Sequence, residues 1–219
     1  MRSPQHQPDP VCRVVVLISG NGSNLQALID HQPEGRYRIV GVVSNRPDAF
    51  GLQRAATAGI ATEVLDHKQF ASREAFDSRL IEQIDQFAPD LVVLAGFMRI
   101  LSSGFVQHYQ GRLLNIHPSL LPKYKGTNTH QRVLAAGDTE HGVSVHFVTE
   151  ELDGGPIVRQ ALISVSTDDN VETLRSRIAA EEHRIYPQVV AWFATGRLSI
   201  KNKAVYLDES ALPPQGMRD

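Results

Sequence analysis

Short apolar runs rich in β-branched residues alternate with stretches of helical periodicity along the first half of the chain, and this alternation constrains the fold more than any other feature. The run from Arg13 to Ile18 is almost entirely apolar, as expected of a strand covered on both faces. Similar runs at 39–44, 62–65, 90–95 and 113–116 predict further strands. Strands that alternate with helices form a parallel sheet with right-handed crossovers. We therefore predict an α/β fold with a doubly wound, mostly parallel open sheet of the Rossmann-like kind.

The pattern changes after residue 125. The segments 143–149 and 157–165 predict two strands only a few residues apart, so we expect an antiparallel C-terminal part of the sheet. Helical spacing predicts a long last helix at about 171–195, and 198–207 is predicted to form a terminal hairpin. Shorter helices are predicted around 25–29, 52–58, 76–87 and 130–136. No internal repeat or linker divides the chain, so we expect one domain over residues 13–219.

Composition narrows the class of protein. The chain of 219 residues is 42% hydrophobic, which is enough for a substantial core. Its single cysteine, Cys12, excludes an internal disulfide and is typical of a reducing compartment, so we expect a cytoplasmic protein. A net charge of -2 without a basic stripe argues against nucleic acid as a partner, and no apolar run reaches the roughly 20 residues that cross a membrane. Residues 1–12, which include Cys12, are predicted to form a disordered extension.

A glycine-rich turn, Ser19-Gly20-Asn21-Gly22-Ser23-Asn24, joins the first predicted strand to the first predicted helix. Its glycines permit a tight turn, its backbone N–H groups suit a phosphate, and Ser23 or Asn24 could cap the helix. Leu25 stands at the third glycine position of the dinucleotide fingerprint, and the turn has no Walker lysine. The residues alone leave two interpretations open: a mononucleotide phosphate site, or an ordinary strand-to-helix turn.

Asn115 and His117 end an apolar run, and Pro118 follows at once. Two residues along an extended chain point to the same face, and the proline stops the strand there. A hydrogen-bond donor and a titratable ring held side by side suit carbonyl chemistry, in which one group stabilises an oxyanion and another handles a proton. A structural role for the histidine remains the alternative.

Asp153 begins the run Asp-Gly-Gly-Pro between the two antiparallel strands, where a turn residue is expected. A carboxylate on this loop could also reach a histidine at the carboxyl edge of the sheet, where ligands of open α/β sheets bind. The histidines show no metal-ligand spacing, so we expect no metal site. The chain has no Gly-x-Ser-x-Gly elbow, which argues against a covalent nucleophile.

Together and in this order, these segments resemble the glycinamide ribonucleotide formyltransferase family of purine biosynthesis. The resemblance extends from Arg13 to about Gly216. It rests on the motifs Val-Leu-Ile-Ser19-Gly20-Asn21-Gly22-Ser23-Asn24-Leu-Gln, Leu-Ala-Gly96-Phe97-Met98-Arg99-Ile100-Leu101, Leu-Asn115-Ile-His117-Pro-Ser-Leu-Leu-Pro and Glu-Leu-Asp153-Gly-Gly-Pro. The second pair of motifs is shared with wider formyl-folate enzymes, whereas the glycine-rich loop is more specific to the ribonucleotide branch.

The resemblance implies a formyltransferase fold and transfer of a formyl group from 10-formyltetrahydrofolate to the amine of glycinamide ribonucleotide, without an acyl-enzyme. In the matching roles, Asn115 donates a hydrogen bond to the formyl oxygen. His117, as the imidazolium, stabilises the oxyanion and passes on a proton, which Asp153 assists. The matching substrate-binding residues are Gly22, Ser23, Asn24 and Glu182. The matching folate-binding residues are Arg73, Met98, Arg99, Ile100, Leu101, Asn115, Thr149 and Asp153. Ala179 stands where some relatives carry a polar residue near the substrate phosphate, so a phosphate contact from the last helix stays open.

Three rival functions are weaker. A formyltetrahydrofolate hydrolase would carry an N-terminal regulatory domain, and about a dozen residues before the first strand are too few for one. A methionyl-tRNA formyltransferase would add a C-terminal module and bind nucleic acid. A non-catalytic module that holds a phosphorylated metabolite would have no use for Asn115, His117 and Asp153 together, and it would tolerate His117→Ala. The sequence leaves the oligomeric state open, with a homodimer as one alternative.

Overall fold

The computed structural model describes residues 11–218, so residues 1–10 of the expected N-terminal extension lie outside the described part. Cys12 corrects that expectation, because it is the first residue of strand β1 (Cys12–Ile18) and is buried. Burial, with a smaller effect of the nearby Asp90 carboxylate, raises the pKa of its thiol to about 12. The strand begins earlier than its apolar run suggests because cysteine packs as a small hydrophobic residue.

The main sheet confirms the predicted fold class. Within residues 11–218 it has the strand order β11-β7-β6-β5-β4-β1-β2-β3. Its other strands are β2 (Tyr37–Ser44), β3 (Thr62–Val64), β4 (Leu91–Leu94), β5 (Leu113–His117), β6 (Glu140–Phe147), β7 (Ile157–Ser164) and β11 (Met217–Arg218). Strands β1 to β5 are parallel, whereas β6 runs antiparallel to both β5 and β7. The antiparallel β6–β7 pair was predicted, and the direct β5–β6 pairing was not.

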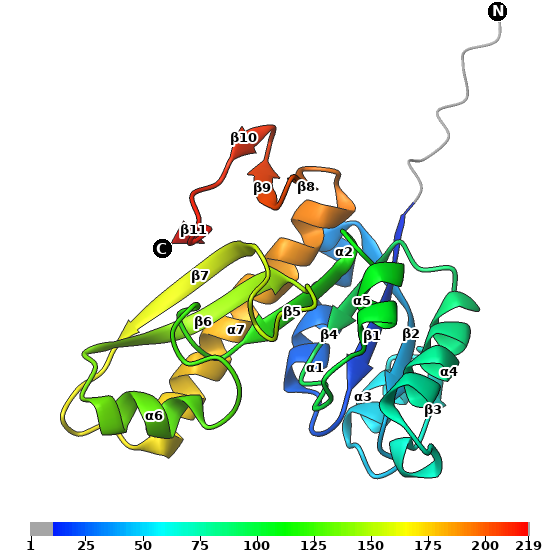
Figure 1. Ribbon diagram of the computed structural model, residues 1–219, viewed down its shortest axis with the longest axis horizontal. Coiled ribbons are helices and arrows are strands. Elements are labelled where there is room, and N and C mark those ends of the chain that lie inside the picture. Colours follow the sequence, from blue (N-terminus) through cyan, green and yellow to red (C-terminus); the bar gives the residue numbers. More distant parts are fainter. Residues whose placement is uncertain (1–10, 219) are drawn as a thin grey trace, which may run out of the picture.

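The predicted terminal hairpin is also present. Strands β8 (Leu198–Lys201) and β9 (Ala204–Leu207) pair antiparallel, and β10 (Ser210–Ala211) extends them into a small second sheet. This sheet lies beside β7 in Figure 1, and the chain then returns to the main sheet, where β11 pairs in parallel with β7. The prediction of a single domain over 13–219 stays a prediction.

The helices agree with the predicted positions in most cases. They are α1 (Ser23–Asp30), α2 (Gln32–Gly35), α3 (Gly51–Thr57), α4 (Arg73–Asp85), α5 (Ser103–His108), α6 (Thr129–Ala136) and α7 (Val171–Ala194), with a 3₁₀ turn, η1 (His67–Gln69). Helix α4 ends at Asp85, before Pro89 is reached. Helices α2 and α5, which were not predicted, are too short to show a helical period in the sequence.

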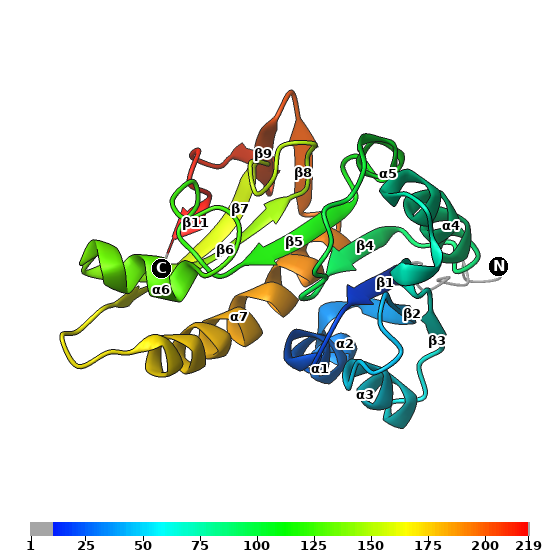
Figure 2. The same cartoon turned by 60° about the horizontal axis from the view of Figure 1, so that its bottom comes forward.

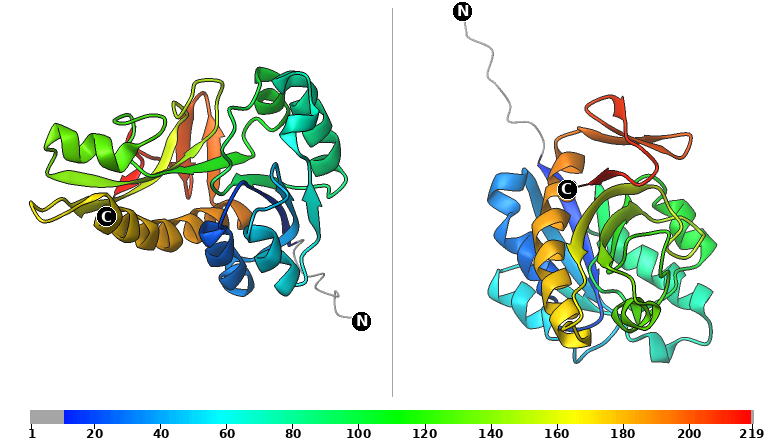
Figure 3. Two further views of the ribbon diagram at one scale, coloured as in Figure 1. Left: turned by 90° about the horizontal axis from the view of Figure 1, so that it is seen from below. Right: turned by 90° about the vertical axis from the view of Figure 1, so that its left-hand side faces the viewer.

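The two faces of the sheet are covered by different helices, as Figure 2 shows. Alternate residues of β1 point to opposite faces. Val14 and Val16 join a core that contains residues of α1, α3 and α7, whereas Val15 and Leu17 join a second core built with α4 and α5. The near-continuous apolar run of β1 therefore reflects burial on both faces. Figure 3 shows α7 running along one face of the sheet beneath β6 and β7.

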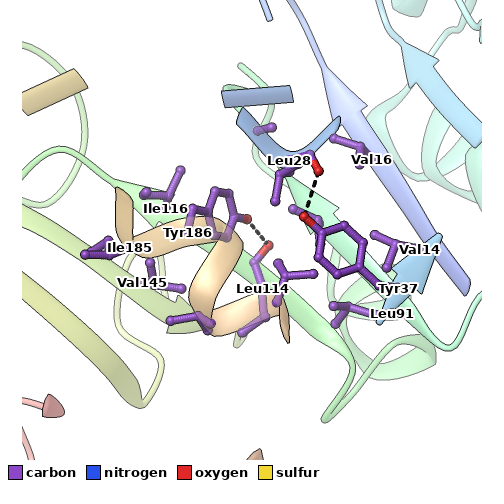
Figure 4. Close-up of a cluster of buried hydrophobic side chains, with 14 of the residues drawn as sticks. Val14, Val16, Leu28, Tyr37, Leu91, Leu114, Ile116, Val145, Ile185 and Tyr186 are labelled. Atoms are coloured by element: carbon purple, nitrogen blue, oxygen red, sulfur yellow. Dashed lines mark hydrogen bonds between the residues drawn. The ribbon is translucent and has the colours of Figure 1, made fainter. Parts of the chain in front are cut away.

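Tyr186 anchors α7 to the two central strands next to the candidate site. Its buried hydroxyl contacts the carbonyl oxygens of Leu94 at 2.8 Å and Leu114 at 3.1 Å, and Figure 4 shows the second contact. Residues four apart lie on one side of a helix. Tyr186 therefore sets the position of Glu182, one turn earlier on α7, relative to the carboxyl ends of the strands.

Within residues 11–218, no helix is long and apolar enough to span a membrane.

Candidate active site

The carboxyl ends of β1, β2 and β4 are joined by one buried hydroxyl, that of Ser19. Its Oγ donates to Asn45 Oδ1 at 2.5 Å and accepts from the Met98 backbone N–H at 2.8 Å. Strands β1 and β4 are neighbours, although the chain adds β2 and β3 on one side before it crosses to the other. This reversal is a topological switch point, where open α/β sheets bind their ligands.

Asn115 and His117 lie at the end of β5, as predicted, and they share one face of the strand. The side chain of His117 is 8% exposed. Its Nδ1 lies 3.5 Å from Asp153 Oδ2, and its Nε2 lies 2.9 Å from the Tyr124 carbonyl oxygen. Each ring nitrogen of His117 therefore faces an oxygen atom that can accept a hydrogen bond.

Asp153 reaches His117 from the loop between β6 and β7, which confirms that the turn places a carboxylate beside the ring. Its φ of 47° is in the left-handed region, which aspartate tolerates better than most residues. Its Oδ2 accepts a hydrogen bond from the Gly126 N–H at 2.8 Å, and Lys125 Nζ lies 2.5 Å from Glu151 Oε1. The loop after β5 and the loop after β6 are therefore tied to each other at the site.

His146 is a site residue that the sequence analysis missed. It pairs with Asn115 across the β5–β6 ladder and is only 2% exposed. Its Nε2 lies 3.2 Å from Asn115 Nδ2 and 3.9 Å from Asp153 Oδ1. Burial lowers the pKa of His146 to about 4, and this outweighs the opposing effects of the Phe147 carbonyl and Asp153. His146 faces Asn115 only because of the antiparallel register between β5 and β6, and the sequence does not reveal this register.

The glycine-rich turn lies at the carboxyl end of β1, and one expectation about it is wrong. Neither Ser23 nor Asn24 caps α1, because the cap residue is Gly22 with a φ of 75° and the helix has no side-chain cap. The first amides of α1 are therefore left without a side-chain acceptor, which suits an anionic ligand. A Cβ on Gly22 would approach Gly51 Cα to 2.7 Å, so only glycine fits the contact with α3.

Asn24 and Glu182 meet, as their shared assignment to substrate binding predicts. Asn24 Nδ2 donates to Glu182 Oε2 at 2.9 Å across the junction of α1 and α7. Burial raises the pKa of Glu182, and the hydrogen bond from Asn24 acts in the opposite direction. Asn24 Oδ1 is buried and has no hydrogen-bond partner in the described part of the chain. The pair offers a carboxylate and a carbonyl oxygen as acceptors beside the turn.

Arg54 of α3 is a second residue that the sequence analysis missed. Its Nε donates to the Asn21 carbonyl at 2.9 Å and one terminal nitrogen donates to Asn21 Oδ1 at 3.0 Å. The other terminal nitrogen donates to Gln26 Oε1 at 3.3 Å. One guanidinium therefore holds the backbone of the glycine-rich turn and the first helix after it.

The predicted folate-binding residues do not share one cavity, and Met98, Arg99, Ile100, Leu101 and Asn115 line neither of the two cavities described next. Thr149 and Asp153 line a cavity of about 1090 Å³ together with residues of α5 and of the β8–β9 hairpin. Arg73 instead lines a separate cavity of about 340 Å³ between α4 and α5. The structure therefore does not bring Arg73 into the cavity of Asp153.

The segment after β4 presents apolar side chains to solvent. Met98 is 73% exposed and Ile100 58% exposed, whereas Leu101 packs against the second core. Arg99 lies over the Phe76 ring at 5.1 Å, and its Nε is buried without a hydrogen-bond partner in the described part. Exposed apolar side chains of this kind are typical of a ligand-binding surface. No cluster of three or more potential metal ligands occurs among residues 11–218.

Comparisons with known proteins agree with this geometry. The formyl transferase family model matches residues 12–190. The phosphoribosylglycinamide formyltransferase of Escherichia coli K12 is 58% identical over 205 residues, which cover 93% of this chain and 97% of that protein. The human trifunctional purine biosynthetic protein adenosine-3 is 47% identical over 190 residues, covering 86% of this chain and 19% of that protein.

A solved structure has the same fold. The phosphoribosylglycinamide formyltransferase of Coxiella burnetii, in complex with CHES, has a TM-score of 0.92 and 54% identity. The match covers 95% of this chain and 99% of that one. The family expected from the motifs is thereby confirmed: this chain belongs to the formyl transferase family, in its phosphoribosylglycinamide formyltransferase branch.

Proposed function

We propose that this chain transfers the formyl group of 10-formyltetrahydrofolate to the amine of glycinamide ribonucleotide, in de novo purine biosynthesis. The products are formylglycinamide ribonucleotide and tetrahydrofolate. The observation that carries the proposal is that the buried His117 lies beside Asp153 at the end of β5, the strand that also carries Asn115, in a fold whose glycine-rich turn leaves α1 without a side-chain cap. A binding module would have no need of this arrangement.

The amine attacks the formyl carbon directly, and no acyl-enzyme forms. The carbonyl π bond opens to an oxyanion, which an N–H of Asn115 and the positive charge of the His117 imidazolium stabilise. Collapse of this intermediate breaks the bond to the folate nitrogen, which takes up the proton that the attacking amine loses, and His117 and Asp153 assist this transfer. Asp153 lies 3.5 Å from the His117 ring, close enough to assist the proton transfer. Fixed donors of this kind lower the barrier because they need no reorganisation during the reaction.

The ribonucleotide binds along the start of α1. The uncapped amides of Gly22, Ser23 and Asn24 receive the phosphate, which the positive end of the helix dipole also favours. Glu182, held by Asn24, accepts hydrogen bonds from the glycinamide end and so directs the amine toward the formyl group. The hydrogen bond between Asn24 and Glu182 and the uncapped start of α1 support these assignments.

The folate binds between the segment Met98–Leu101 and the loop that carries Thr149 and Asp153. Backbone groups of the first segment, which includes Arg99 and Ile100, hold the pterin, and Asn115 meets the formyl oxygen. Arg73, which lines the neighbouring cavity, contacts the acidic end of the folate. A cytoplasmic location and a homodimer belong to the proposal as well, and light scattering on the purified chain tests the second.

Formyl transfer is followed by folate absorbance, with and without glycinamide ribonucleotide. We expect tetrahydrofolate to appear only when the ribonucleotide is present, because its amine is the acceptor. Equal release of folate without the ribonucleotide would make water the acceptor and the chain a hydrolase. No release in either case, with folate and ribonucleotide both binding, would contradict the assignment of a catalytic role.

A further inference from the structure

His146 lies between two of the side chains assigned to chemistry, yet the mechanism above does not use it. It projects from β6 directly opposite Asn115 and is 2% exposed. Its two nitrogens have different surroundings. Nδ1 lies 2.9 Å from the Phe147 carbonyl oxygen, whereas Nε2 lies 3.2 Å from the Asn115 amide nitrogen.

These contacts determine which ring nitrogen carries the hydrogen. A carbonyl oxygen only accepts hydrogen bonds, so Nδ1 must be the donor. Burial lowers the pKa of the ring to about 4, which makes it neutral near pH 7. Nε2 then carries a lone pair and accepts a hydrogen bond from Asn115 Nδ2. Other charged groups near the ring are Asp153, His117 and Lys125.

We propose that His146, as the neutral Nδ1–H tautomer, is a positioning residue that fixes which end of the Asn115 amide meets the formyl group. This inference rests on the proposed function. One of the two hydrogens on Asn115 Nδ2 is bound by His146, and the second is directed away from His146 as the donor to the formyl oxygen. A ring with a hydrogen on Nε2 would instead donate to Asn115 Oδ1, turn the amide over and exchange its donor and acceptor ends.

The ring acts through Asn115 rather than through Asp153. Its Nε2 is 3.9 Å from Asp153 Oδ1, which is beyond hydrogen-bond distance, and a lone pair offers nothing to a carboxylate. The half-buried amide of Asn115 would otherwise have two orientations of similar energy. A fixed orientation matters because an oxyanion donor contributes only when it is in place before the reaction begins.

The first test is nitrogen-15 NMR of the wild-type protein near pH 7, which reads tautomers without any assay of activity. We expect His146 to show a hydrogen on Nδ1 and none on Nε2. A hydrogen on Nε2, in the neutral or the charged ring, would overturn the inference. This result does not depend on the acceptor of the formyl group, so it is distinguishable from a failure of the proposed function.

The second test is a double-mutant cycle with His146→Gln and Asn115→Ala, which measures coupling between the two residues. In the wild-type background, His146→Gln should lower kcat by roughly 10- to 100-fold, part of the loss expected for one oxyanion donor, with both KM values nearly unchanged. In the Asn115→Ala background the same change should have almost no further effect. An equal loss of kcat in both backgrounds would contradict a role through Asn115.

His141→Gln is the matched control. His141 lies on the same strand, is 1% exposed, and contacts His130 rather than Asn115. Any effect of His141→Gln on kcat should therefore be the same with Asn115 present or absent. Circular dichroism and thermal unfolding establish whether each variant is folded. If His146→Gln does not fold, the NMR test still decides the inference, because it uses the wild-type protein.

Discussion

The two halves of the site are built in different ways. The formyl-transfer half, at the β5–β6 junction, consists of buried and half-buried side chains that lie near one another in a chain of pairs: Asn115 with His146, His146 with Asp153, and Asp153 with His117. The ribonucleotide half, at the end of β1, consists mainly of backbone, with Gly22 in a left-handed conformation and no side-chain cap on α1. Side chains there hold the turn from outside, as Arg54 does.

This difference follows from what each half must recognise. Charge that develops on one oxygen atom needs a few donors in fixed places, and buried side chains that restrain one another provide them. A phosphate spreads its charge over several oxygens, and a row of backbone amides at a helix start suits it without any charged side chain. Substitutions should therefore affect kcat in the first half and KM for the ribonucleotide in the second.

The largest effect is expected for His117→Asn, which removes the imidazolium and keeps a polar side chain. We expect kcat to fall by about 100- to 1000-fold, with little change in KM for either substrate. Steady-state kinetics at saturating folate measure this. His31→Asn is the control, because that histidine is exposed at the C-terminal end of α1, the end away from the glycine-rich turn. Near-normal turnover in a folded His117→Asn variant would sink the assigned role.

A smaller effect is expected for Arg54→Gln, which loosens the glycine-rich turn. We predict a rise in KM for glycinamide ribonucleotide of roughly 3- to 10-fold, the size of one lost hydrogen bond, with kcat nearly unchanged. Arg46→Gln is the matched control, since Arg46 is exposed and pairs only locally with Asp48. A loss confined to kcat would mean that the two halves of the site are not separable in this way.

The last prediction concerns acid stability rather than kinetics. The pKa of His141 is lowered to about 4, against about 6.5 in an unfolded chain. Burial is the largest cause, and the neighbouring His130 and His117 add to it. The folded state therefore prefers the neutral ring, so this contribution to stability is present above pH 6.5 and is lost as the pH falls toward 4. Between pH 7 and pH 5, the free energy of unfolding of His141→Gln should therefore fall by about 1–2 kcal/mol less than that of the wild type.

Urea unfolding of the wild type and of His141→Gln at the two pH values measures that difference. An identical pH dependence in both proteins would show that His141 is not a neutral buried ring. His141 would then have no special part in the acid sensitivity of the protein.

The sequence predicted the strands well where both faces are covered. Strand β1 shows as an unbroken apolar run because alternate side chains enter two different cores. It predicted poorly where an element is short, since α5 has too few residues to show a period and β11 has only Met217 and Arg218. Cys12 was assigned to an extension because strand boundaries depend on packing rather than on local composition.

The sequence by itself determined the chemistry available: an amide and an imidazole at the end of β5, a carboxylate in a turn, and a glycine-rich turn after β1. These are visible because proline restricts the backbone locally, whereas glycine permits tight turns that other residues avoid. Only the tertiary structure decided that β6 lies against β5, and therefore that His146 faces Asn115, or that Arg54 reaches back to Asn21. Such pairings depend on strand register and helix docking, which arise from packing among segments far apart in the chain.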